Sequence, residues 1–151
     1  MYYLRSTPWL LLVGLVLFSQ FSCSEDEDDV SQFSIEDYIK RKNLITDTTA
    51  SGLHYIILNP GVDPKPNLTS KVTVTYKGYF LNDDVFNDAS NLTFSLENLI
   101  RGWQEGLPLI GTGGSITILC PPELAYGSSG KGAIPPNTSI GFDIELISHS
   151  K

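Results

Sequence analysis

The sequence has few cysteines, few histidines and little positive charge, and each scarcity narrows the range of functions. Only two cysteines occur among 151 residues, so a framework of several disulfides is excluded. The two histidines, His54 and His149, are far apart and lack a neighbour at ligand spacing, so we expect no metal site. The net charge is −7, and no basic stripe exists that could bind nucleic acid.

Long hydrophobic runs are also missing, apart from one near the start. The apolar segment 9–18 follows Arg5 and is shorter than the about 20 residues that a membrane-spanning helix needs. A positive start followed by a short apolar core is typical of a secretory signal peptide. We therefore expect residues 1–22 to be a signal peptide and the protein to be exported.

Cys23 follows this apolar segment and resembles the lipidation site of bacterial lipoproteins. Cleavage before Cys23 would leave its thiol and amine to carry acyl chains, which would anchor the protein in the bacterial envelope. Gln20 departs from the usual pattern, which has an aliphatic residue there. The alternative is a plain secretory signal with a disulfide from Cys23 to Cys120. We favour lipidation, because a bridge from an unstructured tether would stabilise little.

The residues after Cys23 divide into a tether and a helix. The acidic block 25–29 repels itself, so we expect residues 23–33 to be a solvated tether. In some Gram-negative lineages such a block resembles a surface-export signal, and a plain spacer is the equal alternative. Ser34 is a candidate N-cap, and the basic run 40–42 suits a helix C-terminus. We therefore expect a short helix and loop over residues 34–50.

The remaining residues, 51–151, carry the patterns of a single domain. Apolar and polar residues alternate over 71–80 and 140–146, as they do in half-buried strands, and residues 53–58 are also strand-like. A hairpin turn is expected at 82–84, a further short strand at 94–96, and a short helix over 97–107. These elements predict an α+β fold in which an antiparallel sheet has one helix on its concave face.

Trp103 lies on the expected helix between Gly102 and Gly106. Because glycine costs about 1 kcal/mol relative to alanine inside a helix, two glycines so close to one large ring need a reason. One interpretation is close approach of a backbone or a ligand, with Trp103 as the floor of an apolar pocket. The other is a core tryptophan whose neighbouring glycines mark the helix ends.

Five motifs together resemble one protein family. Residues 74–78, 100–106, 124–127, 134–136 and 142–146 occur in an order and at distances similar to those of the FK506-binding (FKBP) family of peptidyl-prolyl cis/trans isomerases. The resemblance covers about residues 51–148. It implies a bent antiparallel β-sheet wrapped around a short central helix, here preceded by the short N-terminal helix. It also implies catalysis without a cofactor.

The resemblance further implies a role for each candidate site residue. Trp103 would be the pocket floor, the Tyr126 hydroxyl would donate to a substrate carbonyl, and Ile134 would close over the substrate. The Ile100 N–H would hold a second carbonyl. The walls would be Tyr76, Phe86, Leu99, Ile100 and Phe142. Either Leu92 or Phe94 would add a further wall.

Two departures from the family pattern concern the expected pocket. Asn87 stands where the family usually has aspartate, and Asp88 follows one place later. An amide keeps an acceptor oxygen but loses the charge, so we expect weaker catalysis and weaker drug binding. The loop tip 130–133 replaces a bulkier apolar pattern, which predicts a changed substrate preference.

The sequence therefore supports a leading function and an alternative. The leading hypothesis is a membrane-anchored peptidyl-prolyl isomerase that acts on X-Pro segments of folding envelope proteins, with FK506-like or rapamycin-like macrolides as further ligands. The alternative, motivated by Asn87, is a catalytically weak module that only binds proline-containing segments. A weaker third hypothesis makes residues 32–49 a dimerisation helix, but this extension is short and we expect a monomer.

Overall fold

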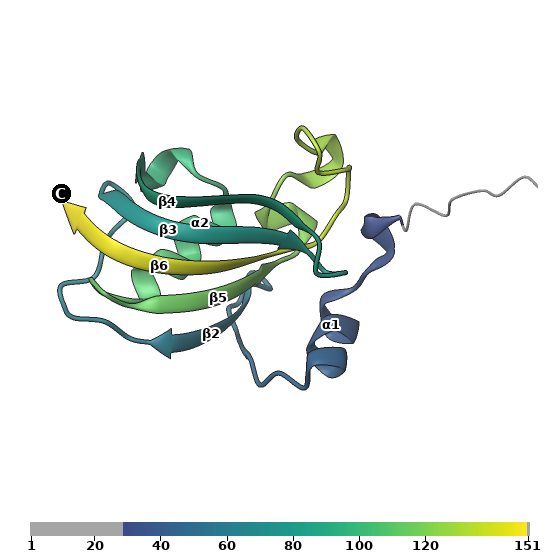
Figure 1. Cartoon of the computed structure of the whole chain (residues 1–151), viewed down its shortest axis with the longest axis horizontal. Helices are drawn as coiled ribbons and strands as arrows, with labels where there is room; N and C mark the ends of the chain where they lie inside the picture. Colours follow the sequence, from purple (N-terminus) through teal and green to yellow (C-terminus); the bar gives the residue numbers. More distant parts are fainter. Residues whose placement is uncertain (1–28, 151) are drawn as a thin grey trace, which may run out of the picture.

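The computed structural model describes residues 29–150, and it arranges them as one antiparallel sheet with a helix on each face (Figure 1). The predicted signal peptide 1–22, the lipidation site Cys23 and most of the acidic block lie outside the described residues. Within residues 29–150, no helix has the length and apolar character that a membrane crossing requires.

The sheet has six strands in the spatial order β1-β2-β5-β6-β3-β4. The long strands β3, β4 and β6 lie side by side and curve around the helix α2 (Figure 1). The predicted α+β fold, a bent antiparallel sheet around a short helix, is thereby confirmed. The strands are β1 (Asp47–Thr48), β2 (His54–Asn59), β3 (Lys71–Phe80), β4 (Val85–Ser95), β5 (Ser115–Cys120) and β6 (Ile140–Ser150).

The alternation that predicted β3 and β6 also assigns their side chains to opposite faces. Val72 and Val74 of β3 are fully buried against α2, on what we call the inner face. Ile144 and Leu146 of β6 point to the same face and are buried with them. Since successive residues of a strand point to opposite sides, the residues between them form the outer face.

Strand β4 differs from the prediction, because the expected separate strand at 94–96 is the end of one continuous strand. Asn91 has a φ of 54°, in the left-handed region that asparagine tolerates better than most residues. The pairing of β4 with β3 shifts register between Val74 and Tyr76, next to this residue. The polar run 87–91 therefore forms a bulged part of the strand and not a loop.

The predicted helix over 97–107 is also shorter than expected. Residues Leu96–Asn98 form a 3-10 turn, and the α-helix α2 spans only Arg101–Gly106, followed by a second 3-10 turn at Leu107–Leu109. Leu99 and Ile100 between them are extended, with ψ angles of 169° and 152°. The chain therefore stretches out immediately before α2, and the N–H of Ile100 is left without an acceptor among residues 29–150.

The two glycines of α2 are explained by contact with the sheet. A Cβ at Gly102 would overlap Sγ of Cys120, and a Cβ at Gly106 would lie 3.0 Å from Ile118. Both neighbours belong to β5. The glycines therefore make room for side chains of β5 and not for a backbone or a ligand at the indole. Gly106 is also the last residue of α2, as the second interpretation expected.

The N-terminal helix α1 (Ile35–Lys42) covers the outer face of the same sheet. Ser34 caps it, with Oγ accepting from the Asp37 N–H at 3.0 Å. Its buried residues join sheet residues in what we call the outer cluster, which consists of Ile35, Tyr38, Tyr79, Leu81 and Leu119. Phe33, at the end of the expected tether, packs against this cluster. The expected loop that follows α1 contains strand β1, which pairs with β2.

Candidate functional site

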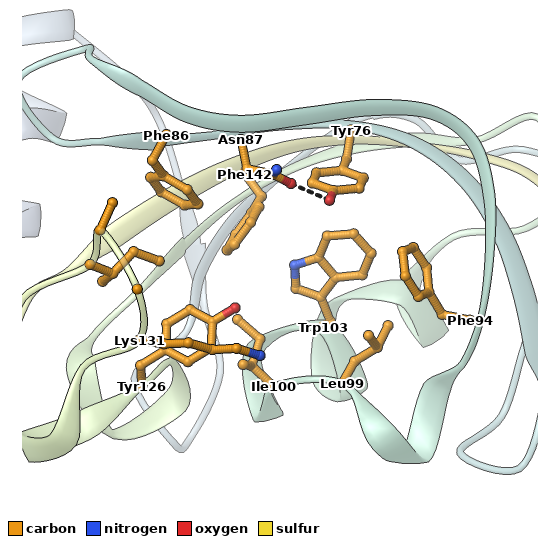
Figure 2. A pocket seen from close by; sticks show the side chains of 13 residues that line it. Tyr76, Phe86, Asn87, Phe94, Leu99, Ile100, Trp103, Tyr126, Lys131 and Phe142 are labelled. Atoms are coloured by element: carbon orange, nitrogen blue, oxygen red, sulfur yellow. Dashed lines mark hydrogen bonds between the residues drawn. The ribbon is translucent and has the colours of Figure 1, made fainter.

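A pocket of about 430 Å³ opens between α2, the inner face of the sheet and the loop 125–137. Figure 2 shows aromatic rings on several of its sides. We call it the aromatic pocket. Its lining residues are Tyr76, Phe86, Asn87, Phe94, Leu99, Ile100, Trp103, Tyr126, Lys131, Gly132, Ala133, Ile134 and Phe142.

Trp103 lies at the centre of the aromatic contacts. Its ring centroid is 5.1 Å from that of Tyr76 and 5.4 Å from that of Phe142, with interplanar angles of 82° and 86°. Such edge-to-face pairs are favourable because the positive ring edge meets the negative ring face. Phe94 makes a third edge contact at 6.3 Å. The indole is only 4% exposed, so these contacts fix it as a rigid apolar platform.

Gly78 of β3 leaves the space that two wall residues occupy. A Cβ at this position would lie 2.7 Å from the Phe86 ring and 2.8 Å from the Phe142 ring. These two rings are themselves in edge contact, with centroids 5.8 Å apart. A side chain at position 78 would therefore push the pocket wall inward, which is a physical reason for the glycine in the motif 74–78.

Tyr126 supplies a hydrogen-bond donor at the side of the pocket opposite β4. It follows the 3-10 turn Pro122–Leu124, and Figure 2 shows its hydroxyl directed toward the middle of the pocket. Burial raises the pKa of Tyr126, and the nearby Tyr76 and Cys120 add to that effect. The hydroxyl therefore stays protonated, and it makes no hydrogen bond within residues 29–150.

A second donor comes from the extended residues before α2. The carbonyl oxygen of Ile100 accepts from the N–H groups of Trp103 and Gln104, at 3.0 and 3.2 Å. The N–H of Ile100 itself has no acceptor in the part of the chain that the structure describes. The side chain of Gln104 holds this segment by donating to the carbonyls of Glu97 and Leu99. The pocket therefore offers a positioned backbone N–H beside the tryptophan.

Asn87 and Asp88 point to opposite sides of β4. Asn87 lines the pocket, and its Oδ1 accepts a hydrogen bond from the Tyr76 hydroxyl (Figure 2). Asp88 lies opposite Lys77 on β3 and lines a separate depression on the outer face. Because strand residues alternate, Asp88 cannot substitute for a carboxylate at position 87. The described pocket lining therefore contains no negative charge.

All nine side chains expected at the site line this one pocket: Tyr76, Phe86, Asn87, Leu99, Ile100, Trp103, Tyr126, Ile134 and Phe142. Of the two residues between which the sequence could not choose, Phe94 lines the pocket and Leu92 does not. Alternation could not have chosen between them, because Leu92 and Phe94 are two residues apart and pair with Val74 and Val72 on the same face of the sheet. Leu92 is 45% exposed there.

Three residues of the loop tip also line the pocket, namely Lys131, Gly132 and Ala133. The sequence analysis expected this tip to change substrate preference but assigned no role to its individual residues. Hydrogen bonds of 2.9 and 3.0 Å between the backbones of Lys131 and Ile134 close this turn. Gly130, with a φ of 65°, precedes it and lies so close to Ile134 that no Cβ would fit.

Other chemically active residues lie away from the pocket or are deeply buried. Cys120 is fully buried, and burial raises the pKa of its thiol, so it is a poor nucleophile. Among residues 29–150, no three histidine, cysteine, aspartate or glutamate side chains come together as a metal site. The expected lipidation at Cys23 stays a prediction, because that residue lies outside the described part.

The chain is similar in sequence to a family of known enzymes. Residues 63–147 match the family model described as FKBP-type peptidyl-prolyl cis-trans isomerase. The FKBP-type peptidyl-prolyl cis-trans isomerase FkpA of Escherichia coli K12 is 39% identical over 116 residues, which cover 74% of this chain and 42% of that protein. The peptidyl-prolyl cis-trans isomerase Mip of Coxiella burnetii is 40% identical over 109 residues, covering 69% of this chain and 47% of Mip.

Solved structures agree with the sequence comparisons. The crystal structure of FkpA from Escherichia coli matches with a TM-score of 0.72 and 35% identity, over 76% of this chain and 57% of that one. A peptidyl-prolyl cis-trans isomerase from Pseudomonas syringae matches with a TM-score of 0.69 and 30% identity, over 77% of this chain and 90% of that one. The chain spans less than half the length of the curated relatives named above.

Proposed function

This chain belongs to the family of FKBP-type peptidyl-prolyl cis-trans isomerases, and from that premise we propose that its aromatic pocket binds X-Pro segments and accelerates rotation about their peptide bond. The reaction needs no cofactor. Rotation is slow because it breaks amide resonance, at a barrier of about 18–20 kcal/mol. For X-Pro the cis and trans forms differ by only about 0.5–1 kcal/mol, so their interconversion is limited by its rate and not by its equilibrium.

A catalyst of this rotation needs an apolar site and few groups that stabilise the planar amide. A twisted amide has lost much of its charge separation, so a dry pocket favours it over the planar ground state. Trp103 would support the proline ring, and Tyr76, Phe86, Phe94 and Phe142 would exclude water around it. Ile134, which is 7% exposed, would cover the bound segment from the loop.

The observation that carries this proposal is a pair of donors without protein acceptors next to an apolar floor. The Tyr126 hydroxyl and the Ile100 N–H have no partner within residues 29–150, and both belong to residues that line the pocket. A substrate segment has carbonyl groups on either side of its proline. Binding them at the two donors would hold the chain on each side while the bond between them rotates.

The test is turnover of a short X-Pro peptide, with and without a pocket-filling macrolide of the FK506 class. We expect the protein to accelerate isomerisation and the macrolide to abolish the acceleration. A Trp103→Leu variant keeps an apolar side chain but loses the flat platform, and it should be inactive while it remains folded by circular dichroism. Acceleration that survives both treatments would contradict the proposed site.

The second candidate function is a binding module that holds proline-containing segments without turning them over. Asn87 favours it, because this amide already accepts the Tyr76 hydroxyl and brings no negative charge to the pocket. It predicts that the protein binds unfolded polypeptide and the macrolide but leaves the rate of isomerisation unchanged. Macrolide binding without turnover would therefore replace the first function with the second.

We also propose that the protein acts in the bacterial envelope as a lipid-anchored protein. The proposed division is a signal peptide over 1–22, a tether over 23–33 that begins at lipidated Cys23, a helix and loop over 34–50, and the isomerase domain over 51–151. The complete burial of Cys120 against α2 supports lipidation over a disulfide to Cys23. The mass of the mature N-terminal peptide tests this, because acyl chains and an unmodified thiol differ by hundreds of daltons.

The protein is proposed to be a monomer. The apolar residues Ile35 and Tyr38 of α1 are buried within the chain, where they pack against Tyr79 and Leu81. A helix whose apolar face is already buried has little left to offer a second copy. Sedimentation or gel filtration at micromolar concentration should give the mass of one chain, and a dimer would contradict this.

A further inference from the structure

Lys131 is the one charged side chain among the described residues that line the aromatic pocket. Its ammonium nitrogen lies 5.4 Å from the centroid of the Tyr126 ring, close enough for a cation–π contact. Figure 2 shows the side chain running along that ring toward Ile100. The closed turn between Lys131 and Ile134 fixes its backbone. A ring and a turn therefore hold this cation at the pocket rim.

No carboxylate of the pocket balances this charge. Every ion pair found within residues 29–150 involves other cations, namely Arg41, Lys42, Lys77 and Arg101. On the opposite rim, the Tyr76 hydroxyl occupies Oδ1 of Asn87, which leaves the amide N–H groups as donors. The pocket thus presents one cation and several donors, in a chain whose net charge is −7.

We propose that Lys131 makes this site prefer X-Pro segments that carry a carboxylate on a residue flanking the proline. This inference rests on the proposed function of the pocket. With the proline ring on Trp103 and a flanking carbonyl at Tyr126, the neighbouring residue is only about 3.3–3.6 Å farther along the chain. An Asp or Glu side chain there reaches the ammonium group above the Tyr126 ring.

The expected size of the effect follows from the exposure of the rim. Lys131 is solvent-exposed, and exposed ion pairs change an equilibrium by at most about fivefold. We expect a preference of about threefold for glutamate over glutamine next to proline. Since the screening length is about 10 Å at 0.1 M salt and about 3 Å at 1 M, the preference should disappear at high salt. The net charge of the chain acts over longer distances and is screened first.

The experiment compares kcat/KM for matched peptides that differ only by Glu or Gln, placed either before or after the proline. The readout is the Glu/Gln ratio within each protein, so that a general change in activity cancels. The full chain is compared with Lys131→Gln, with Lys131→Glu and with the control Lys40→Gln, whose exposed lysine lies on α1. The same peptides are also titrated calorimetrically, which measures preference without relying on turnover.

The proposal expects a ratio of about three in the full chain and in Lys40→Gln, about one in Lys131→Gln, and below one in Lys131→Glu. A ratio of one in the full chain, or a ratio that Lys131→Gln leaves unchanged, would overturn it. If no peptide is turned over but calorimetry gives the same ratios, the isomerase function fails while the role of Lys131 stands. If turnover is normal and both ratios are one, only the role of Lys131 fails.

Discussion

The aromatic pocket and the outer cluster both combine tyrosines with a helix on the same sheet, but Tyr126 of the pocket differs from the tyrosines of the outer cluster in its hydrogen bonding. On the outer face, Tyr38 donates to Asp83 and Tyr79 donates to Asp143, so the protein satisfies its own polar groups. In the pocket, the Tyr126 hydroxyl has no partner within residues 29–150. Tyr126 is half-buried, so its hydroxyl is open to a hydrogen bond from outside the protein. The difference supports the proposal that the outer cluster is structural and the aromatic pocket binds a ligand.

Charged side chains on the two faces show the same contrast: they are paired on the outer face and unpaired at the pocket among the described residues. Asp143 on the outer face pairs with Lys77 at 3.3 Å and accepts from Thr117 at 2.8 Å. Within residues 29–150, the Lys131 ammonium on the pocket side lies over the Tyr126 ring and makes no ion pair. Polar groups that are matched within the protein stabilise the fold, whereas unmatched groups around an apolar floor are available for recognition.

The largest expected effect comes from removing one aromatic side chain from each face. Both Trp103→Ala and Tyr38→Ala should lower the free energy of unfolding, by about 3–5 kcal/mol for the buried tryptophan. Only Trp103→Ala should abolish isomerisation, because Tyr38 lies on the outer face. Urea unfolding measures the change in stability, and peptide turnover measures isomerisation. Both are measured well below the melting temperature of each variant. Equal turnover in the two variants would contradict the assignment of function to the pocket and of structure to the outer cluster.

The next effect concerns the tight contact of α2 with the sheet. Gly102→Ala should cost about 1–3 kcal/mol, because the new Cβ meets Sγ of Cys120, which is fully buried. Cys120→Ala removes that sulfur, so the double variant should be more stable than the sum of the two single changes implies. Urea unfolding of all four proteins gives the coupling. Strict additivity would show that α2 moves away to avoid the contact.

A matched pair of hydroxyl deletions tests the two faces more finely. Tyr126→Phe should lower kcat/KM about fivefold, which corresponds to one hydrogen bond of about 1 kcal/mol, and should leave stability unchanged. Tyr79→Phe should do the reverse, because its hydroxyl bonds Asp143 and lies far from the substrate. The measurements are peptide turnover and thermal unfolding. Loss of stability in Tyr126→Phe would mean that this hydroxyl is structural.

A smaller effect is expected from neighbouring residues on β4. Asn87→Asp restores a carboxylate beside the Tyr76 hydroxyl, and a charge-assisted bond there should raise kcat/KM about threefold. Asp88→Asn makes the reciprocal change on the outer face and should leave turnover unaltered. If Asn87→Asp also left turnover unchanged, charge at this edge would be irrelevant to the reaction.

The smallest expected effect is the response of turnover to pH. Burial raises the pKa of Tyr126, so its hydroxyl remains a donor beyond the ordinary tyrosine pKa of about 10, and kcat/KM should be flat from about pH 6 to about pH 9. Burial also raises the pKa of Tyr79. A raised pKa in the folded state gives stability that is complete below the unfolded pKa, so stability should decline above about pH 10. An inflection in turnover near pH 7 would indicate a proton-transfer step.

The sequence predicted those parts of the fold in which local pattern and tertiary structure agree. The alternation in β3 and β6 fixed their inner faces, and the turn at 82–84 formed as expected, with Phe80 and Asp84 paired by a backbone hydrogen bond of 2.8 Å. Six of the nine expected site residues could be named because they lie in motifs that recur in order within one family, which brings tertiary information that no local pattern contains. The other three, Phe86, Asn87 and Leu99, lie outside these motifs and were named from the same family resemblance.

The errors came from places where distant contacts overrule local preference. Residues 87–91 have the composition of a loop, yet pairing with β3 holds them in a strand with a bulge at Asn91. The stretch before α2 looked helical, but Gln104 bonds the carbonyls of Glu97 and Leu99 and keeps it extended. The inward turn of Lys131 depends on a hairpin of four residues, whose direction the sequence does not encode locally.

Phe142 and Asp143 are adjacent in β6, yet the first faces the pocket and the second faces α1. Because neighbouring residues of a strand face opposite sides of the sheet, one face can be altered with little disturbance of the other. For protein engineering, this makes the outer face a place where reporters, linkers or other domains can be fused near α1. The pocket can meanwhile be diversified at its loop tip at Lys131 and Ala133, which are exposed and, unlike Gly132, do not have a positive φ. Substrate preference and a fused domain could thus be engineered at separate sets of residues.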